Sequence, residues 1–525
     1  MGHLIPMLQL AHLFSTRRGV RATVVAPAAA IPLIQPTLRH HPIQLLPLGD
    51  SDADALPLVT HPQNNKFTPE MVAAILRLEA PFVQLLRDHC PDCIVADLHY
   101  SWASSVAEEQ GIPRLQFTGA GCFATVLLAT IGLQSKLILP DHDDRRPFLI
   151  PGLPKEIHLT TSQLPEFVTH PTETLRVADS AQCFGMVINT FDDLERDYIL
   201  HAKKYSGMKI WCLGPFSLSQ PEVVASNCSD ELMRWLDSKK QRYSVLYLCF
   251  GSLGLLTTTQ LREIALGLQA SLVDFVWVVR DAGDSAEWLP EGFNERVMSS
   301  GKGMILKDWV PQRLILNNEA VGGFVTHCGW NSCLEAVAAG VPMVTWPLHS
   351  DQFLNEKLLV EELRIGVPVG ATVCSLKADE RNLVKAEAIR KAVGEVMGSG
   401  EEVQARRERV ATLREMAAKA VVEGGTSYSD MDNLLDDLIS LKAATSPPNE
   451  ICEEQELLAS AGIGVLSSGE PEQQTSMPQR SPQRRGGLLA PLLDKATADG
   501  AESSGQGKIS VAVTEEIATG ARVRL

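Results

Sequence analysis

One short stretch of the sequence, from Trp309 to Gln352, contains residues that could bind a charged ligand carrying sugars. Within it His327 and Gly329 follow an apolar run, and Asn331 with Ser332 then opens a helical segment. The free N–H groups at the start of a helix form an anion site. Because this segment contains neither Lys nor Arg, a bound anion would depend on backbone, hydroxyl and amide donors and one imidazole. These features suit a diphosphate.

Other residues of the same stretch could hold the rest of a nucleotide sugar. Glu335 lies one helical turn beyond Asn331 and could accept hydrogen bonds from sugar hydroxyls. Trp309 could stack on a planar base. Asp351 and Gln352 follow the next apolar run and could hydrogen-bond several hydroxyls of a second sugar. The stretch thus contains candidate binding residues for a base, a ribose, a diphosphate and a sugar, and it predicts a nucleotide-sugar site.

Each of these residues also has a purely structural interpretation. Ser332 and Glu335 have the spacing of a capping box, which alone would explain both. A single histidine such as His327 is more often a buried structural residue than a phosphate ligand, and Trp309 and Trp330 are more often packing residues. Only the joint spacing of the residues favours the ligand site.

The same stretch alternates between short apolar runs and helical segments. The runs predict strands at Gly303–Leu306, Gly323–Thr326 and Met343–Trp346, and helices lie between them at Gln312–Leu316 and Ser332–Ala339. Two crossovers in so few residues imply a parallel sheet. The ligand crevice of such a sheet lies beyond the carboxyl ends of its strands, where the polar residues fall.

The first half of the chain alternates in the same way. We expect a helix at Ile5–Arg17, a strand at Ala22–Ala26, a buried strand at Cys93–Ala96 that ends in Asp97, a helix at Ser101–Gln110 and a strand at Arg114–Phe117. Asp97 could cap the helix that follows it. The pattern predicts an α/β protein with doubly wound domains.

We expect the first strand of a second domain at Ser244–Phe250, which leads into Gly251 and Ser252. Glycine would let the backbone approach a ligand closely, and the serine could donate to a phosphate. We expect a first domain over residues 1–212, a linker over 213–229 and a second domain over 230–442. Residues 443–525 contain no Phe, Trp or Tyr and many Ser, Pro, Gly, Gln and Glu. We expect this tail to be disordered.

Composition excludes several classes of protein. The 525 residues carry a formal net charge of −16, which argues against a nucleic-acid partner and against docking on anionic lipid. Eleven cysteines scattered through a large chain do not make a disulfide framework, and Cys90 and Cys93 are better explained by packing than by redox chemistry. No apolar run approaches the ~20 residues of a membrane span. These features predict a cytoplasmic protein.

Two local patterns suggest other functions, and the sequence around each argues against it. Gly119-Ala120-Gly121-Cys122-Phe123-Ala124 fits a dinucleotide fingerprint, but the acid twenty residues on, Asp141, falls in a loop rather than at the end of a strand. The Asp52-Ala53-Asp54 segment could hold a metal. It lies in a Ser/Asp-rich loop without an adjacent strand, so we expect it to be exposed.

The Trp309–Gln352 stretch resembles the 44-residue signature of plant secondary-product UDP-glycosyltransferases, and flanking resemblance extends over residues 1 to 441. That family is inverting and has two facing Rossmann-like domains, the GT-B fold, with a last helix that braces the first domain. Its resemblance implies a donor site that comprises the signature residues, together with Val310 and the Gly251–Ser252 turn. The signature positions are Trp309, Gln312, His327, Gly329, Trp330, Asn331, Ser332, Glu335, Asp351 and Gln352.

The catalytic residues are implied by the same resemblance. The family carries a histidine in a GHxxP turn and an aspartate after a later strand; His3, in the Gly2–Pro6 turn, and Asp97 match these positions. His3 would be the base that activates the acceptor hydroxyl, and Asp97 would orient its ring. The departing diphosphate would be stabilised by His327, Asn331, Ser332 and the helix dipole, without a metal.

The implied function is transfer of a sugar from a UDP-sugar to a hydroxyl of a small lipophilic acceptor such as a flavonoid or terpenoid, giving a β-glycoside. Trp330 and Gln352 resemble members of the family that favour UDP-glucose. The UDP-sugar would be a co-substrate, no metal cofactor is expected, and we expect a monomer. The competing hypothesis is a protein that binds UDP-sugars without turnover.

One element of the family pattern is missing at the start of the chain. In the family an apolar strand comes immediately before the GH turn, but only Met1 precedes Gly2 here. A central strand of about 5–6 residues would bury several large side chains. Without it we expect unpaired backbone groups on both neighbouring strands, a poorly folded first domain and little transferase activity.

Overall fold

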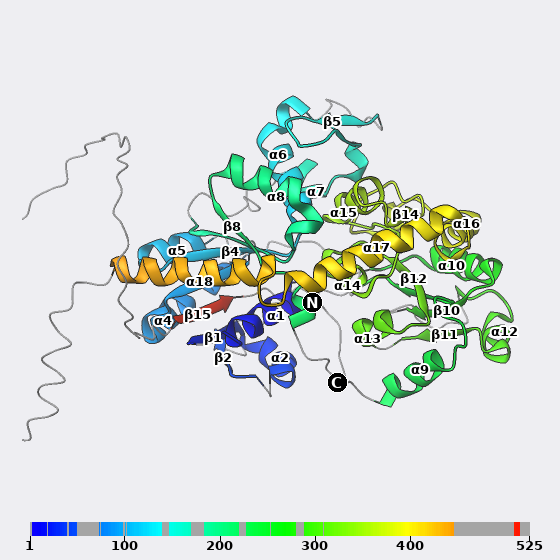
Figure 1. The fold of residues 1–525 in the computed structure, drawn as a ribbon, viewed down its shortest axis with the longest axis horizontal. Coiled ribbons are helices and arrows are strands. Elements are labelled where there is room, and N and C mark those ends of the chain that lie inside the picture. Colours follow the sequence, from blue (N-terminus) through cyan, green and yellow to red (C-terminus); the bar gives the residue numbers. More distant parts are fainter. Residues whose placement is uncertain are drawn as a thin grey trace, which may run out of the picture. The chain divides into compact units, whose positions relative to one another are not determined.

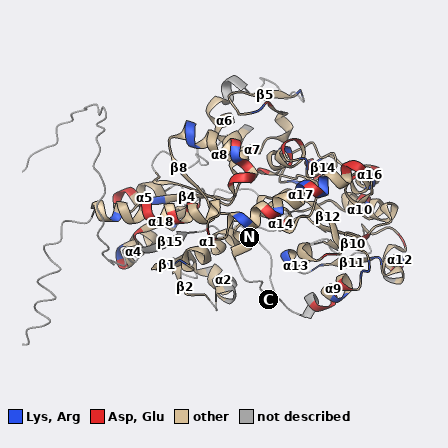
Figure 2. Ribbon diagram, viewed as in Figure 1, with Lys and Arg blue, Asp and Glu red and all other residues tan. Residues whose placement is uncertain are grey.

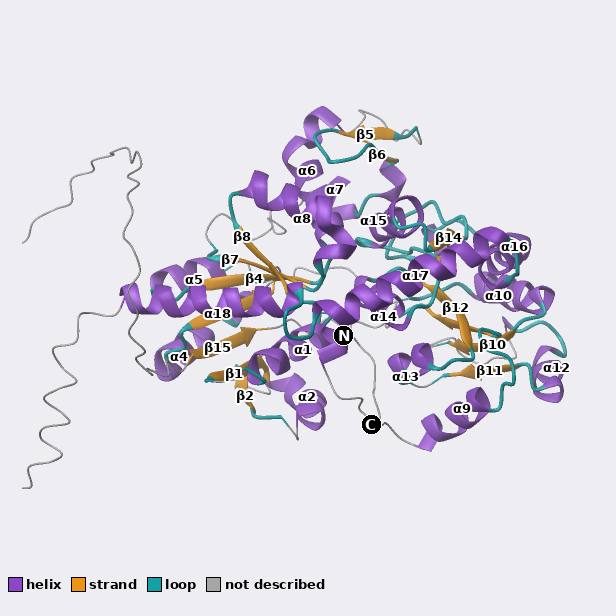
Figure 3. Ribbon diagram, viewed as in Figure 1, coloured by secondary structure: helices purple, strands orange, loops and turns teal. Residues whose placement is uncertain are grey.

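The computed structural model describes residues 3–17, 19–38, 41–49, 73, 75–97, 100, 102–138, 146–169, 183–219, 227–251, 254–279, 288–307, 309–445 and 509–514. The chain divides into two units, one of Met1–Ile439 with Lys508–Leu525 and one of Ser440–Gly507. Both large sheets belong to the first unit (Figures 1 and 3). The second unit contributes only the end of a helix to the described residues.

The first sheet has seven described strands, all parallel, in the spatial order β2-β1-β15-β3-β4-β7-β8. The central strands β3 and β4 are buried at every position, as expected for a parallel sheet covered on both faces. The strands are β1 (Val20–Pro27), β2 (Ile43–Leu48), β3 (Cys93–Asp97), β4 (Arg114–Thr118), β7 (Gly185–Ile188), β8 (Lys209–Cys212) and β15 (Ile509–Thr514). The helices between them are α1 (Leu4–Ser15), α2 (Ile31–Leu38), α4 (Glu79–His89), α5 (Ala103–Glu109), α6 (Cys122–Ile138), α7 (Glu166–Thr169) and α8 (Asp192–Ser206).

Strand β15 corrects two expectations drawn from the sequence. Residues 443–525 were expected to be disordered, but Ile509–Thr514 forms a strand inside the first sheet, drawn as the red arrow beside β1 in Figure 1. Unpaired backbone groups were expected on both neighbours of a missing strand, but β1 pairs with all six residues of β15 and β3 pairs with Val511–Thr514. A parallel strand of β-branched residues supplies that pairing from the far end of the sequence. Residues 446–508 and 515–525 lie outside the described residues.

The second sheet has six described parallel strands in the order β11-β10-β9-β12-β13-β14. Its strands are β9 (Val245–Cys249), β10 (Asp274–Val278), β11 (Gly303–Leu306), β12 (Val321–Thr326), β13 (Met343–Thr345) and β14 (Gly366–Pro368). Its helices are α9 (Asn227–Asp237), α10 (Thr258–Ser271), α12 (Phe293–Ser300), α13 (Gln312–Asn317), α14 (Trp330–Ala339), α15 (Gln352–Lys357), α16 (Ala386–Met397) and α17 (Glu401–Ala420). A small antiparallel pair, β5 (Phe148–Ile150) and β6 (Ile157–Leu159), lies outside both sheets.

The last long helix, α18 (Thr426–Thr445), packs on the first sheet although it follows the second in sequence. Its buried residues Met431, Leu434 and Leu438 share a hydrophobic cluster with Phe14 of α1 and Trp211 of β8. The backbone N–H of Cys212 donates to Asp430, and Ser427 donates to the carbonyl of Gly214. Charged residues are concentrated on the helices, whereas the strands are mostly uncharged (Figure 2). The apolar faces of the helices therefore cover two apolar sheets.

Candidate functional site

His3 and Asp97 meet at the carboxyl end of the first sheet. His3 immediately precedes α1, and its Nδ1 lies 2.7 Å from Oδ2 of Asp97, the last residue of β3. The Asp97 side chain is fully buried, whereas the His3 side chain is 39% exposed. Because a carboxylate only accepts hydrogen bonds, Nδ1–H is the donor and Nε2 is the basic nitrogen of the neutral ring. The N-cap of helix α5 is Trp102, whose side chain makes no capping hydrogen bond.

Gly119 provides the space that the His3 ring occupies. A Cβ atom at Gly119 would lie 2.8 Å from Cε1 and 3.0 Å from Nδ1 of His3, closer than a side chain can approach. In the sequence, Gly119 stands out only as part of a dinucleotide-like pattern, and its contact with His3 was not predicted. The run Gly119-Ala120-Gly121 after a strand was the available signal, since such glycines mark a close approach to the backbone.

The start of helix α6, where a dinucleotide would place its phosphates, is occupied by a side chain. The buried Glu195 accepts hydrogen bonds from the backbone N–H of Cys122 at 3.0 Å and of Phe123 at 2.7 Å. Burial raises the pKa of Glu195, and its hydrogen bonds oppose that shift. With both amides satisfied, this helix end offers no anion site, which agrees with the sequence argument against a dehydrogenase.

His327, at the end of β12, lies tightly between two glycines. A Cβ atom at Gly251 would come within 2.6 Å of the imidazole ring, and one at Gly329 within 2.4 Å of its Nε2. Burial lowers the pKa of His327 to about 4, so the ring is neutral near pH 7. Its Nδ1 is buried and has no hydrogen-bond partner among the described residues. Ser252, predicted beside Gly251, lies outside the described residues.

Gln312 links Ser332 and Glu335 at the start of α14. The Nε2 atom of Gln312 donates to Oε2 of Glu335 at 2.8 Å and to Oγ of Ser332 at 3.0 Å. Its Oε1 accepts from the hydroxyl of Tyr247 at 3.2 Å. The capping-box interpretation of Ser332 and Glu335 is wrong, because the helix already starts at Trp330 and its N-cap has no side-chain hydrogen bond. Burial raises the pKa of Glu335, with Gln312 opposing the shift.

Asp351 and Gln352 lie in the loop after β13. Oε1 of Gln352 accepts from the backbone N–H of Leu348 at 2.9 Å and of His349 at 3.0 Å, so the side chain also fixes this loop. Asp351 accepts from Nδ2 of Asn355 at 2.9 Å. Burial raises the pKa of Asp351, and the hydrogen bond from Asn355 opposes that shift.

The aromatic residues of the stretch differ in exposure. Trp309 is 40% exposed, as a surface that stacks on a ligand requires, whereas Val310 beside it is buried. Trp330 is buried, and its Nε1 donates to the carbonyl of Asn189, after β7, at 2.7 Å. Its packing interpretation therefore holds. Trp330 also lies where a Cβ at Gly121 would be only 2.7 Å away, so it joins the two halves of the unit.

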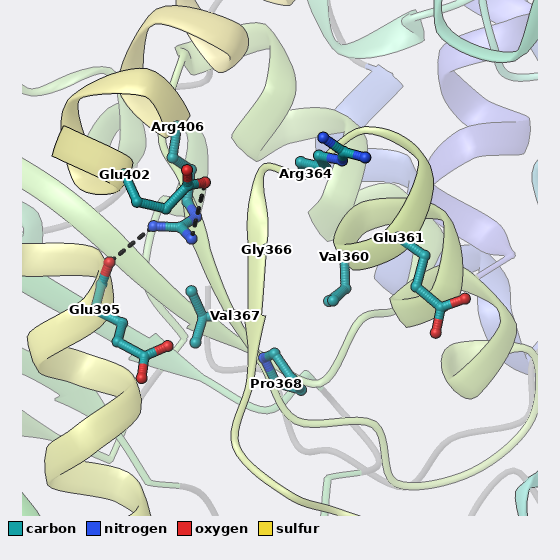
Figure 4. Close-up of a pocket in the computed structure, with 9 residues that line it drawn as sticks. All are labelled: Val360, Glu361, Arg364, Gly366, Val367, Pro368, Glu395, Glu402 and Arg406. Atoms are coloured by element: carbon teal, nitrogen blue, oxygen red, sulfur yellow. Dashed lines mark hydrogen bonds and ion pairs between the residues drawn. The ribbon is translucent and has the colours of Figure 1, made fainter.

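A pocket of about 480 Å³ lies away from these residues, between β14, α16 and α17 (Figure 4). Of its two arginines, Arg406 donates to the carbonyl of Glu395 at 2.8 Å and lies 3.6 Å from Glu402. None of the candidate residues lines it. It is lined by Val360, Glu361, Arg364, Gly366, Val367, Pro368, Glu395, Glu402 and Arg406.

Among the described residues, no group of three or more His, Cys, Asp or Glu side chains is arranged to hold a metal ion. No described helix is both long and apolar enough to cross a membrane.

Known proteins resemble this chain over most of its length. Residues 224–385 match the family described as UDP-glucoronosyl and UDP-glucosyl transferase. The UDP-glucose flavonoid 3-O-glucosyltransferase 7 of Fragaria ananassa is 41% identical over 470 residues, 84% of this chain and 94% of that protein. The scopoletin glucosyltransferase of Nicotiana tabacum is 39% identical over 469 residues, 83% of this chain and 95% of that protein.

Solved structures agree with the sequence comparison. Glycyrrhiza uralensis UGT73P12, in complex with glycyrrhetinic acid 3-O-monoglucuronide, is similar with a TM-score of 0.76 and 33% identity, covering 87% of this chain and 96% of that one. Medicago truncatula UGT71G1, in complex with UDP-glucose, gives 0.70 and 28%, covering 83% and 96%. The predicted resemblance and the predicted GT-B architecture of two Rossmann-like domains are confirmed. The chain belongs to the UDP-glycosyltransferase family and is a glycosyltransferase.

Proposed function

We propose that the protein transfers glucose from UDP-glucose to a hydroxyl group of a small lipophilic acceptor, inverting the anomeric centre to give a β-glycoside. The relatives are named for flavonoid, scopoletin and anthocyanin acceptors, which are small phenolic compounds. The single observation that carries the proposal is the His3–Asp97 pair, with a buried carboxylate 2.7 Å from a half-exposed imidazole.

His3 is proposed as the general base. With Nδ1–H donated to Asp97, Nε2 accepts the proton of the acceptor hydroxyl as its oxygen attacks the anomeric carbon. The bond to the UDP oxygen breaks on the opposite face, and the buried carboxylate stabilises the imidazolium that forms. Gly119 leaves room for the ring, since a side chain there would lie within 3 Å of it.

The donor is proposed to lie across the ends of β9, β12 and β13. Trp309 and Val310 would border the base, and Glu335, with Gln312, would accept from the ribose hydroxyls. Asp351 and Gln352 would bind the sugar. The diphosphate would be bound by Gly251, Ser252, His327, Gly329, Asn331 and Ser332.

The leaving diphosphate is proposed to be stabilised without a metal. A neutral His327 can donate one hydrogen bond to a phosphate oxygen, and the start of α14 adds backbone N–H groups and the positive end of the helix dipole. We expect the transfer rate to be unchanged in excess EDTA, which a direct assay measures.

Further assignments follow from this function. Residues 1–212 with Ile509–Thr514 would hold the acceptor, and residues 230–442 would hold the UDP-sugar, with 213–229 as the linker. Among the residues that the structure describes, nine cysteines, including Cys90 and Cys93, are free thiols, which supports a cytoplasmic location. We propose a monomer.

The alternative is a protein that binds UDP-sugars without turnover. An assay of the purified chain with UDP-glucose and a panel of phenols, alongside the His3→Ala variant, separates the two. Release of UDP with formation of a β-glucoside, lost in the variant, supports transfer. Tight UDP binding with no product from any acceptor supports the alternative.

A further inference from the structure

Strand β15 lies at the centre of the first sheet although it comes from the far end of the sequence. Residues Val20 to Val25 of β1 pair with Ile509 to Thr514, and Cys93 to Ala96 of β3 pair with Val511 to Thr514, both in parallel. Among the described strands no other lies between β1 and β3. Among the described strands, β1 and β3 are therefore joined into one sheet only by β15.

The place that β15 occupies is linked to the catalytic pair. Helix α1 leads into β1, and in a right-handed strand–helix–strand unit the strand before such a helix belongs beside β1. Strand β2 pairs with one edge of β1, and β15 pairs with the other edge. Thr514 at the end of β15 pairs with Ala96, the residue before Asp97. The carboxyl end of β15 thus reaches the level at which Asp97 bonds His3.

We propose that the C-terminal segment around Ile509–Thr514 is a working part of the catalytic domain: it fills a strand-binding groove between β1 and β3, and the His3–Asp97 geometry depends on it. The partner that this groove fits is a parallel strand of alternating β-branched residues, here Ile509-Ser510-Val511-Ala512-Val513-Thr514 of the same chain. Only the activity readout below rests on the proposed function.

The physical reason is that a central parallel strand satisfies backbone groups on two neighbours at once. Without it the facing N–H and C=O groups of β1 and β3 would be unpaired beside buried side chains such as Val24 and Val95. The connection does not limit the arrangement, because residues 446–508 can span roughly 200 Å when extended. A strand donated by a second copy is therefore an outcome that the test must separate.

A cysteine cross-link tests which strand fills the groove. The register pairs Val24 with Val513, and neighbouring strands lie about 4.8 Å apart, within the range of a disulfide. In the full chain, the double variant Val24→Cys/Val513→Cys should form an intramolecular disulfide, whereas Val24→Cys alone should not. A cross-linked dimer would show that a second copy supplies the strand, and no cross-link in a folded chain would overturn the proposal.

Proline substitution tests whether the strand matters. The variant Val511→Pro/Val513→Pro loses two ladder N–H groups, and Val511→Ile/Val513→Ile is the matched control. We expect at least tenfold faster amide hydrogen exchange in β1 and β3, unchanged exchange in β9 and β12, and at least a tenfold lower transfer rate. A synthetic peptide of residues 507–516 should slow the exchange again, and a scrambled peptide should not. Unchanged exchange in the proline variant would overturn the proposal.

The readouts separate failure of this inference from failure of the proposed function. Cross-linking and hydrogen exchange do not require turnover. An intramolecular cross-link in a chain without transferase activity would support the strand assignment and contradict the proposed function. Normal transfer by the proline variant, with amide hydrogen exchange in β1 and β3 still slow, would support the proposed function and contradict the strand assignment.

Discussion

The Nδ1 atom of His3 lies 2.7 Å from Oδ2 of Asp97, and the two residues differ in exposure: the carboxylate is fully buried and the imidazole is 39% exposed. The buried partner fixes the ring while the exposed side remains accessible to an acceptor. This pairing joins the start of α1 to the end of β3, and it leads directly to a prediction about rate.

Removing either member of the pair should lower the rate and leave donor binding intact. For His3→Ala we expect kcat to fall by about 10²–10⁴, the usual contribution of a general base. Asp97→Asn should also lower kcat, because a neutral amide does not stabilise the imidazolium. Steady-state kinetics measures kcat, and calorimetric titration with UDP provides the control. Wild-type kcat in a folded His3→Ala variant would rule out this base.

Glu335→Ala should weaken UDP binding by about 1.5–3 kcal/mol, or roughly 10- to 150-fold, if the carboxylate accepts from the ribose. Since burial raises the pKa of Glu335, affinity should fall on acidification at a higher pH than for an exposed glutamate. Titration calorimetry at several pH values tests both points. Glu335→Gln, which retains an acceptor for Gln312, is the matched variant. An unchanged affinity with a lower melting temperature would leave Glu335 only a structural role.

Gln352→His should shift donor preference from glucose toward galactose by about tenfold in the ratio of kcat/KM values. The reason is that the amide is replaced beside the sugar hydroxyl whose orientation differs between glucose and galactose. The variant should also melt at a lower temperature, since Oε1 of Gln352 accepts from the backbone of Leu348 and His349. Gln352→Glu keeps an oxygen that can accept both of these hydrogen bonds and serves as the control for stability. An unaltered ratio in a folded Gln352→His variant would contradict the sugar assignment.

His327 should make stability depend on pH. Its folded pKa, about 4, lies below the ordinary value of 6.5, so the unfolded chain binds more protons between these limits. Stability is therefore full above pH 6.5 and falls as the pH drops toward 4. Between pH 7.5 and 5 the wild type should lose about 2 kcal/mol more than His327→Gln. Urea denaturation at both pH values measures this difference, and equal losses would show that His327 is not buried as a neutral ring.

Gly121→Ala should destabilise the protein by about 1–3 kcal/mol, because the new methyl group would lie 2.7 Å from the Trp330 ring and 2.9 Å from Oε1 of Glu195. Gly132→Ala, inside the helix α6 that Gly121 precedes, is the control: a Cβ there meets nothing within 4 Å, so about 0.5–1 kcal/mol of stabilisation is expected. Thermal unfolding of both variants gives the comparison. Equal melting temperatures would mean that the Trp330 contact is looser than the structure indicates.

The elements around the donor site could be predicted from local patterns. The strand Gly303–Leu306 agrees with β11 residue for residue, and Gly323–Thr326 is β12 without its first two residues. Such agreement is possible because the apolar runs of a buried parallel strand are continuous and short. The start of α14 was placed two residues late, since Ser332 and Glu335 have the spacing of a cap that the helix does not use.

The long-range contacts could not be predicted in this way. Glu195 accepts from the backbone N–H groups at the start of α6, although it lies more than seventy positions away in the sequence. No local pattern near either segment predicts this contact. The same holds for β15: six residues, Ile509–Thr514, lie in a segment whose composition is typical of disorder. The pairing of β15 depends on its two neighbouring strands, β1 around Val24 and β3 around Val95, which lie far from it in the sequence.

The position of β15 in the sequence has a consequence for biosynthesis. Strand β3 leaves the ribosome roughly 400 residues before β15, which at about 5–20 residues per second is a delay of about 20–80 s. Throughout that interval β1 and β3 present bare edges to other nascent chains. The second sheet, whose strands all lie between Val245 and Pro368, can close before the first. The domain that is translated first is thus completed last, and during synthesis it is the part most in need of a chaperone.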